Sequence, residues 1–222
     1  MAAAAAAAAA YSPAARRWYL TWGAMEAEAG GPLPGDELVA EPDLQSTRAV
    51  TIDAPPMAVW PWLVQMGSGR GGAYTYDWIE NLFGLDMHSA DEILPQFQGL
   101  AVGDVLPLGP NGPGMRIEIC DPGRTLAFRS VDGNWVWIFD LHGDASATRL
   151  VSRNRIATPD ASWRGRLVNR LVMEPGSMIM ERRMLRGIKE RAERATPATE
   201  PSQPGGPADR GRSALTPRRT GP

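Results

Sequence analysis

The chain has 222 residues, of which 43% are hydrophobic, and a formal net charge of −2 at pH 7. This length and composition suffice for one buried core, and the charge gives the chain no overall attraction to nucleic acid. Cys120 is the only cysteine, which excludes an intrachain disulfide and a cysteine-based zinc site and favours a reducing, cytoplasmic location. No stretch reaches the ~18 consecutive apolar residues of a membrane-spanning helix.

Both ends of the chain are of low complexity. Met1 is followed by nine alanines without the basic and leucine-rich parts of a signal peptide, so residues 1–15 are predicted to be disordered, and a misassigned start codon explains them equally well. Residues 195–222 are rich in Pro, Gly and Arg and are predicted to form a disordered tail, because such a composition cannot offset its ordering entropy. Between the ends, residues 16–46 are expected to be an N-terminal arm over the core, and residues 47–194 the folded domain.

The folded part begins with a strand and two short helices. Residues 47–53 alternate β-branched and apolar positions and end at Ala54-Pro55-Pro56, which predicts a strand followed directly by a helix start. Val59, Leu63 and neighbouring apolar residues then recur at helical spacing. A second short helix is predicted over residues 76–83, where Gly84 can end it.

From Val102 onward the pattern changes to short strands separated by turn residues. Asn111-Gly112, Asp132-Gly133 and similar pairs are typical hairpin connections, so we expect an antiparallel meander. The predicted strands cover residues 104–108, 115–120, 125–130, 134–141 and 148–156. A long helix over residues 162–194, interrupted at Pro175-Gly176, closes the domain. The sequence therefore predicts an α+β fold with about six strands.

This order resembles that of the START-like helix-grip (SRPBCC) superfamily, in its bacterial polyketide cyclase/dehydrase-like branch. The resemblance is carried by TRAVTIDAPPMAVWPWLVQMG at residues 47–67, GRGGAYTYDWIENLFGLDMHSAD at 69–91 and LAVGDVLPL at 100–108. It implies a curved antiparallel sheet wrapped around the C-terminal helix, with an apolar cavity between them. Members bind lipids, sterols, polyketides or hormones, and some cyclise or hydrolyse them. The superfamily has no universal catalytic set, so no active-site residue is carried over.

The expected pocket wall combines aromatic side chains with methionines. Trp135 and Trp137 alternate along one strand face and could stack on a flat hydrophobic ligand, although packing against the long helix would use the same face. Methionines on that helix adapt to varied apolar shapes. Arg153 is a candidate polar anchor if it faces inward, and an ordinary solvated residue if it faces outward. The full set of predicted ligand-binding residues is Trp62, Met66, Tyr74, Tyr76, Trp78, Trp135, Trp137, Arg153, Met180 and Met184.

Two polar groups in the 64–91 segment are candidates for chemistry. His88 and Asp91 are three residues apart, so a helical turn would place a carboxylate beside an imidazole as a general base. The alternative is that Asp91 caps a helix and His88 bonds a loop carbonyl. The glycine-rich loop at residues 67–72, with Arg70, could bind an anion or act as a lid hinge. No metal-ligand spacing matches a standard motif, and no cofactor is expected.

The sequence thus favours binding or transport of a small hydrophobic or amphipathic ligand between the sheet and the C-terminal helix. One alternative is a cyclase- or dehydratase-type enzyme using His88 and Asp91, and another is a protein-interaction module using Trp18, Tyr19 and Trp22. Residues 163–194 carry nine basic and four acidic side chains, which could aid peripheral contact with anionic lipid or simply form a solvated face. The oligomeric state stays open.

Overall fold

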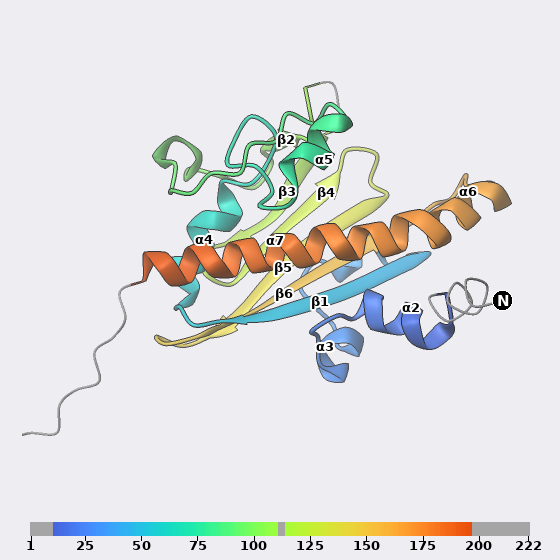
Figure 1. The fold of residues 1–222 in the computed structure, drawn as a ribbon, viewed down its shortest axis with the longest axis horizontal. Coiled ribbons are helices and arrows are strands. Elements are labelled where there is room, and N and C mark those ends of the chain that lie inside the picture. Colours follow the sequence, from blue (N-terminus) through green and yellow to red (C-terminus); the bar gives the residue numbers. More distant parts are fainter. Residues whose placement is uncertain (1–10, 111–113, 197–222) are drawn as a thin grey trace, which may run out of the picture.

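The computed structural model describes residues 11–110 and 114–196, and its centre is one antiparallel sheet of six strands in the order β1-β6-β5-β4-β3-β2 (Figure 1). The strands are β1 (Leu44–Ile52), β2 (Val105–Pro107), β3 (Gly114–Asp121), β4 (Thr125–Ser130), β5 (Trp135–Gly143) and β6 (Thr148–Ile156). The helices are α2 (Pro13–Leu20), α3 (Glu26–Gly30), α4 (Pro56–Val64), α5 (Asp77–Leu82), α6 (Trp163–Val168) and α7 (Glu174–Ala195), with the short helical turns η1 (Asp36–Val39), η2 (Pro95–Phe97) and η3 (Asn169–Met173).

These elements confirm the predicted helix-grip architecture, with two short helices after the first strand and a long C-terminal helix across the sheet. Helix α2 begins at Pro13, within the 1–15 segment for which the sequence predicts disorder, because the Ser12 side chain caps its first turn. The predictions for residues 1–10 and 197–222 lie outside the described residues.

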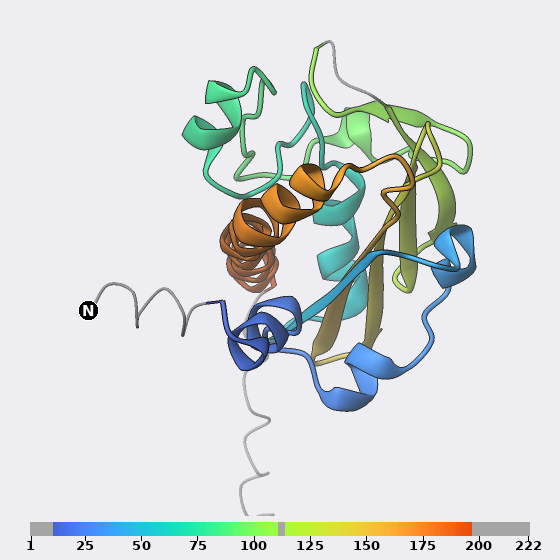
Figure 2. The same ribbon diagram turned by 90° about the vertical axis from the view of Figure 1, so that its right-hand side faces the viewer.

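The main core lies between the concave face of the sheet and α7. Strand β5 turns Trp137 and Phe139 toward the helix, and its partner β4 adds Phe128 and Leu126 in register. Met184 on α7 is almost fully buried in the same cluster. Figure 2 shows α7 on one side of the sheet with α4 wedged beside it. The period-2 pattern of β5 therefore identified the inward face correctly.

The C-terminal helical run contains a π turn, η3, directly before α7. Proline in a helix has no N–H and its ring clashes with the carbonyl four residues earlier. For Pro175 that carbonyl belongs to Leu171, and it accepts a hydrogen bond from the Tyr11 hydroxyl at 2.9 Å instead. The predicted interruption at Pro175-Gly176 therefore occurs one turn earlier, because η3 widens the backbone ahead of the proline.

A buried ion pair fixes α7 to the sheet. Glu181 accepts hydrogen bonds from Ser152 Oγ at 2.6 Å, from Asn154 Nδ2 at 3.2 Å and from the Arg48 guanidinium. The Arg48 side chain is fully buried and that of Glu181 is 7% exposed. Arg48 also donates to the Tyr19 carbonyl at 3.0 Å, which joins α2 to the same network. The Glu181 carboxylate thus connects α7 to both β1 and β6.

The convex face of the sheet is covered by the segment that contains α3 and η1, which Figure 2 shows on the side away from α7. Three arginines on one face of β6 bind this segment. Arg149 binds Glu28 with two nitrogens at 2.7 Å, and Arg155 donates to the carbonyls of residues 39 and 40 at 2.9 Å. Arg153 is 1% exposed and pairs with Asp36 at 2.6 Å. Arg153 therefore faces outward, away from α7, but is buried under the arm and is not a solvated residue.

Candidate functional site

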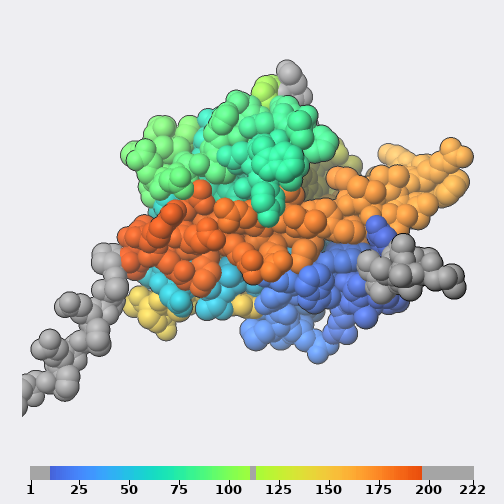
Figure 3. Space-filling view, in the orientation of Figure 1, coloured from blue at the N-terminus to red at the C-terminus, as the bar shows by residue number. Residues whose placement is uncertain are grey.

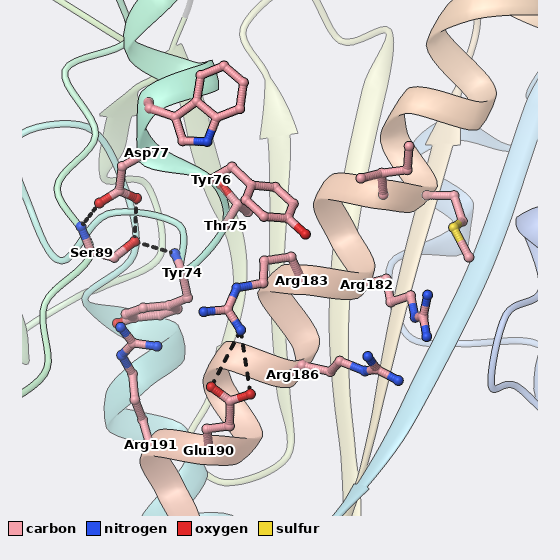
Figure 4. Close-up of a pocket in the computed structure, with 13 residues that line it drawn as sticks. Tyr74, Thr75, Tyr76, Asp77, Ser89, Arg182, Arg183, Arg186, Glu190 and Arg191 are labelled. Carbon is pink, nitrogen blue, oxygen red and sulfur yellow. Dashed lines mark hydrogen bonds and ion pairs between the residues drawn. The ribbon is translucent and has the colours of Figure 1, made fainter.

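A groove of about 680 Å³ lies between residues 74–78, a loop that leads into α5, and the outer side of α7 (Figure 4). The loop side is formed by Tyr74, Thr75, Tyr76, Asp77 and Trp78, together with Ser89. The helix side is formed by Met178, Ile179, Arg182, Arg183, Arg186, Glu190 and Arg191. The groove therefore joins segments that are far apart in the sequence, and it combines apolar and cationic side chains.

Local hydrogen bonds make the loop side rigid. Asp77 accepts from the Ser89 hydroxyl at 2.6 Å and from the Ser89 amide at 2.8 Å, and the Ser89 hydroxyl in turn accepts from the Tyr74 amide at 2.9 Å. The Tyr74 hydroxyl donates to the Trp62 carbonyl at 3.0 Å, so this ring is directed into the core. Tyr74 also has a φ of 58°, a left-handed conformation that a large residue adopts only where its surroundings enforce it. The loop is thus held in one shape before any ligand arrives.

Tyr74 and Arg191 join the loop to the helix. The Arg191 guanidinium carbon lies 4.8 Å from the centre of the Tyr74 ring, and Arg191 also donates to the Ala90 carbonyl at 2.7 Å. Burial raises the pKa of Tyr74 well above its ordinary value, so its hydroxyl stays protonated and acts as a donor within the core.

Helix α7 packs closely against Tyr74 at Gly187. A Cβ atom at this position would lie 2.7 Å from the Tyr74 carbonyl oxygen and 2.9 Å from the Tyr74 Cβ. Any larger residue would push the two walls apart. The close approach of α7 to Tyr74, which lines the groove, therefore requires glycine at this position.

Three arginines give the helix side its charge. Arg182 and Arg186 make no hydrogen bond to any residue that the structure describes, and their guanidinium carbons lie 5.2 and 5.7 Å from the Trp22 ring. Arg183 meets Glu190 only at 3.5 Å. Figure 4 shows Arg183 directed toward the loop and the other two toward the opposite side of the helix. The lining has four arginines against Asp77 and Glu190, so its net charge is about +2.

The predicted ligand-binding residues fall into separate places. Tyr74, Tyr76 and Trp78 line the groove. Trp62, Met66 and Met184 are buried in the core, and Met180 is half-buried on α7. Arg153 lies on the convex side of the sheet, as described above.

Trp135 and Trp137 are half-buried on the concave face. Their rings stack with centroids 6.0 Å apart, and their indole nitrogens donate to Asn154 at 2.8 Å and Ser152 at 2.9 Å. Trp135 also borders a smaller hollow of about 410 Å³ at the end of the sheet, beside Leu108 and residues 156–161. This hollow has no arginine in its lining.

His88 and Asp91 have different partners. His88 Nε2 lies 3.2 Å from Asp86 Oδ1, whereas Asp91 is bound by Arg191 at 2.9 Å. Residues 85–90 contain no helix, so the helical turn that would join His88 to Asp91 is absent. Both side chains are more than three-quarters exposed. The structure therefore does not bring these two residues together as an acid–base pair.

The backbone amides of the glycine-rich loop at residues 67–72 donate hydrogen bonds to nearby backbone carbonyls. Gly67 and Gly72 exchange backbone hydrogen bonds at 3.0 and 3.2 Å, and the Gly71 amide donates to the Gln65 carbonyl at 2.8 Å. Arg70 donates to the carbonyls of Val64, Met66 and Phe97 and stacks on the Phe97 ring. These groups close the loop and are not directed at a ligand, so the anion-binding interpretation of this loop has no support.

The groove arginines were not among the sequence candidates. The sequence RRMLR at residues 182–186 could have indicated them, because spacings of one and four residues place the three arginines on neighbouring parts of a helix surface. No group of three His, Cys, Asp or Glu residues in the described parts of the chain is arranged to hold a metal ion. Within the same parts, no helix combines the length and apolarity needed to cross a bilayer.

Comparisons with known proteins find similarity only among solved structures. No family model matches the sequence, and the search of curated proteins finds no match. Among solved structures, protein MLL2253 from Mesorhizobium loti is 16% identical with a TM-score of 0.40, and the similarity covers 68% of this chain and 98% of that one. The KanY protein is 13% identical with a TM-score of 0.44, over 68% and 97% of the two chains. The Polyketide_cyc-like protein Cgl2372 from Corynebacterium glutamicum is 17% identical with a TM-score of 0.34, over 67% and 86%.

These similarities are distant, and the assignment of this chain to the helix-grip fold rests on its own strand order and on α7. The groove described above is a property of this chain's own residues.

Proposed function

We propose that this protein binds a small amphipathic acid in the groove between residues 74–78 and α7. The apolar part of the ligand would lie against Tyr76, Trp78 and Ile179, and its carboxylate or phosphate would be bound by the groove arginines. This keeps the class of ligand that the sequence favours and moves its site from the concave face of the sheet to the outer side of α7.

One observation carries the proposal. The groove contains the Arg183 guanidinium, which points toward the loop and meets only Glu190, at 3.5 Å, among the described residues, while Arg182 and Arg186 border the groove from the other side of the helix. Guanidinium groups pair with carboxylates and phosphates through two parallel hydrogen bonds, and such charged hydrogen bonds are about twice as strong as neutral ones. A cationic wall opposite exposed aromatic rings suits a molecule with one acidic and one apolar end.

The rigidity of the loop supports the same conclusion. Because Asp77, Ser89 and Tyr74 fix the loop by hydrogen bonds, ligand binding would not have to order it. Preorganised sites bind more tightly because less conformational entropy is lost on association. The groove is also large enough for a drug-sized ligand, which ordinarily occupies about 300–1,000 Å³.

Isothermal titration with decanoate and with octyl phosphate tests the proposal. Replacing one groove arginine in the variant Arg183→Gln removes a charged hydrogen bond of about 1.5–3 kcal/mol, so affinity for either acid should fall roughly tenfold or more. Decanol, which has the same chain but no charge, should lose little affinity in this variant. Arg170→Gln on η3, outside the groove, is the matched control and should leave all three affinities unchanged.

A second variant separates the groove from the concave face of the sheet. Trp78→Ala should weaken binding of both acids, because it removes an exposed ring from the groove wall. Trp137→Ala should leave binding intact once its lower stability is taken into account. Equal affinity of the wild type and Arg183→Gln for both acids, together with loss of binding in Trp137→Ala, would overturn the proposal in favour of a site under the helix.

A further inference from the structure

The segment formed by α6 and η3 extends past the end of the sheet and carries apolar side chains into solvent. Figures 1 and 3 show it projecting beyond the neighbouring elements. Trp163 is 70% exposed, Val172 61% and Met173 59%, and Leu167 and Val168 are also exposed. Single exposed apolar residues are ordinary, but a run of them on one projecting helix is typical of an interaction surface.

All charged side chains of the same segment are basic. Residues 161–173 contain Arg164, Arg166 and Arg170 and no acidic residue. None of the three arginines forms an ion pair within the residues that the structure describes. Arg164 instead stacks on the Trp163 ring, with 5.3 Å between its guanidinium carbon and the ring centre. The surface therefore has positive charge available for an anionic partner.

A second apolar group lies on α5 and on the residue that follows it, at the other side of the groove. Leu82 is 75% exposed, Phe83 77% and Trp78 66%. Trp78 and Ile179 line the groove itself, and Ile179 follows Val172 on the same helical run. Exposed apolar side chains thus stand on both sides of the groove, on α5 and along the run from α6 to the start of α7.

We propose that α6 and η3, together with the tip of α5, bind peripherally to an anionic lipid bilayer. Trp163 and Leu167 would insert at the level of the headgroups, while the three arginines would contact lipid phosphates. An aromatic residue, aliphatic residues and unpaired arginines on one short amphipathic segment are the combination that interfacial helices use. A protein partner is less well matched, because arginine-rich surfaces without acidic residues gain most from a uniformly negative surface.

This inference is independent of the proposed ligand. The two would act together, since a groove flanked by membrane-inserting residues could receive an amphipathic acid directly from a bilayer. Membrane binding can nevertheless be measured without any ligand in the groove, and failure of one proposal leaves the other standing.

Vesicle flotation of the full chain tests the inference. The probes are vesicles of phosphatidylcholine alone and vesicles that also contain phosphatidylglycerol. Binding is expected only to the second kind and should weaken at high salt. The double variant Arg166→Gln/Arg170→Gln should reduce the partition coefficient by roughly fivefold per arginine. Trp163→Ser/Leu167→Ser should abolish flotation, whereas Met57→Ser, an exposed apolar residue on α4 beside the β3–β4 turn, is the matched control.

Two results would overturn the inference. One is equal flotation of the wild type and Trp163→Ser/Leu167→Ser with vesicles that contain phosphatidylglycerol. The other is a dimer in sedimentation velocity that Trp163→Ser/Leu167→Ser dissociates while no vesicle binds, which would assign the surface to a second copy of the chain. The substituted residues are exposed, so circular dichroism should show unchanged folding in each variant and separate lost binding from lost structure.

Discussion

The strongest single test of the fold is the removal of one charge at Glu181, the carboxylate that joins α7 to β1 and β6. The variant Glu181→Gln keeps the size of the side chain and can still bond Ser152 and Asn154. It leaves the fully buried Arg48 guanidinium without an opposite charge. Breaking a buried ion pair on one side costs about 3–5 kcal/mol, because an uncompensated charge stays in the interior.

The structure supplies the matched control. Glu190 lies on the same helix and contacts Arg183 only at 3.5 Å, with side chains 54% and 38% exposed. Exposed pairs contribute about 0.2–1 kcal/mol, so Glu190→Gln should change stability by no more than that. At roughly 2–4 °C per kcal/mol, Glu181→Gln should lower the melting temperature by about 6–20 °C.

Urea unfolding followed by far-UV circular dichroism is the appropriate assay, since the midpoint and the slope separate a change in stability from a change in compactness. The double variant Arg48→Met/Glu181→Gln should recover part of the loss, because both charges are then gone. The reasoning fails if Glu181→Gln unfolds within about 1 kcal/mol of Glu190→Gln.

Three further outcomes follow from the described contacts. Burial raises the pKa of Glu80 above its ordinary value of 4.5, so the folded state holds this proton more tightly than the unfolded state and stability falls as pH rises. The variant Glu80→Gln should therefore stabilise the protein at pH 7 and have little effect below pH 4.5. Melting curves recorded at several pH values test this. The Arg149 guanidinium holds the pKa of Glu28 below its usual range, so the stabilisation is present at neutral pH and lost as pH falls, and Arg149→Gln should destabilise at pH 7 but not in acid. Gly187→Ala should cost about 1–3 kcal/mol in urea unfolding and weaken decanoate binding by separating the groove walls, whereas Gly176→Ala, which meets no atom within 4 Å, should do neither.

Much of the sheet could be predicted from the sequence because its signals are local. The predicted strand over residues 125–130 coincides with β4, and that over 148–156 coincides with β6. Both runs contain β-branched and apolar residues and follow turn residues that are typical of hairpin connections. The inward face of β5 was predictable for the same reason, since alternation along a strand needs no knowledge of distant segments.

The positions of polar side chains could not be predicted in this way. Arg153 had two expected environments, inside the pocket or in solvent, and it occupies a third, buried beneath the arm beside Asp36. Asp36 and Arg153 are far apart in the sequence, so no local pattern indicates that they form a pair. His88 was expected beside Asp91 through a helical turn, but Asp91 is drawn to Arg191 on α7 instead.

The candidate site was predicted on its loop side only. Tyr74, Tyr76 and Trp78 were identified from the density of aromatic residues after α4, and all three line the groove. The opposite wall depends on which stripe of α7 faces this loop, and that is set by packing of the whole helix against the sheet. The arginines at 182–186 were therefore predicted from the sequence as part of a solvated face or of a contact with anionic lipid, and not as a ligand site.

The most direct test of the proposed function is an NMR titration of the isotope-labelled protein with decanoate, kept below its micelle concentration. The account predicts that the largest shift changes occur in the Trp78 indole, in the amides of residues 75–78 and 179–186, and in the Arg183 side chain. The indole signals of Trp135 and Trp137 should stay in place. Large changes in these two indoles, with the amides of residues 75–78 unaffected, would contradict the account and place the ligand on the concave face of the sheet.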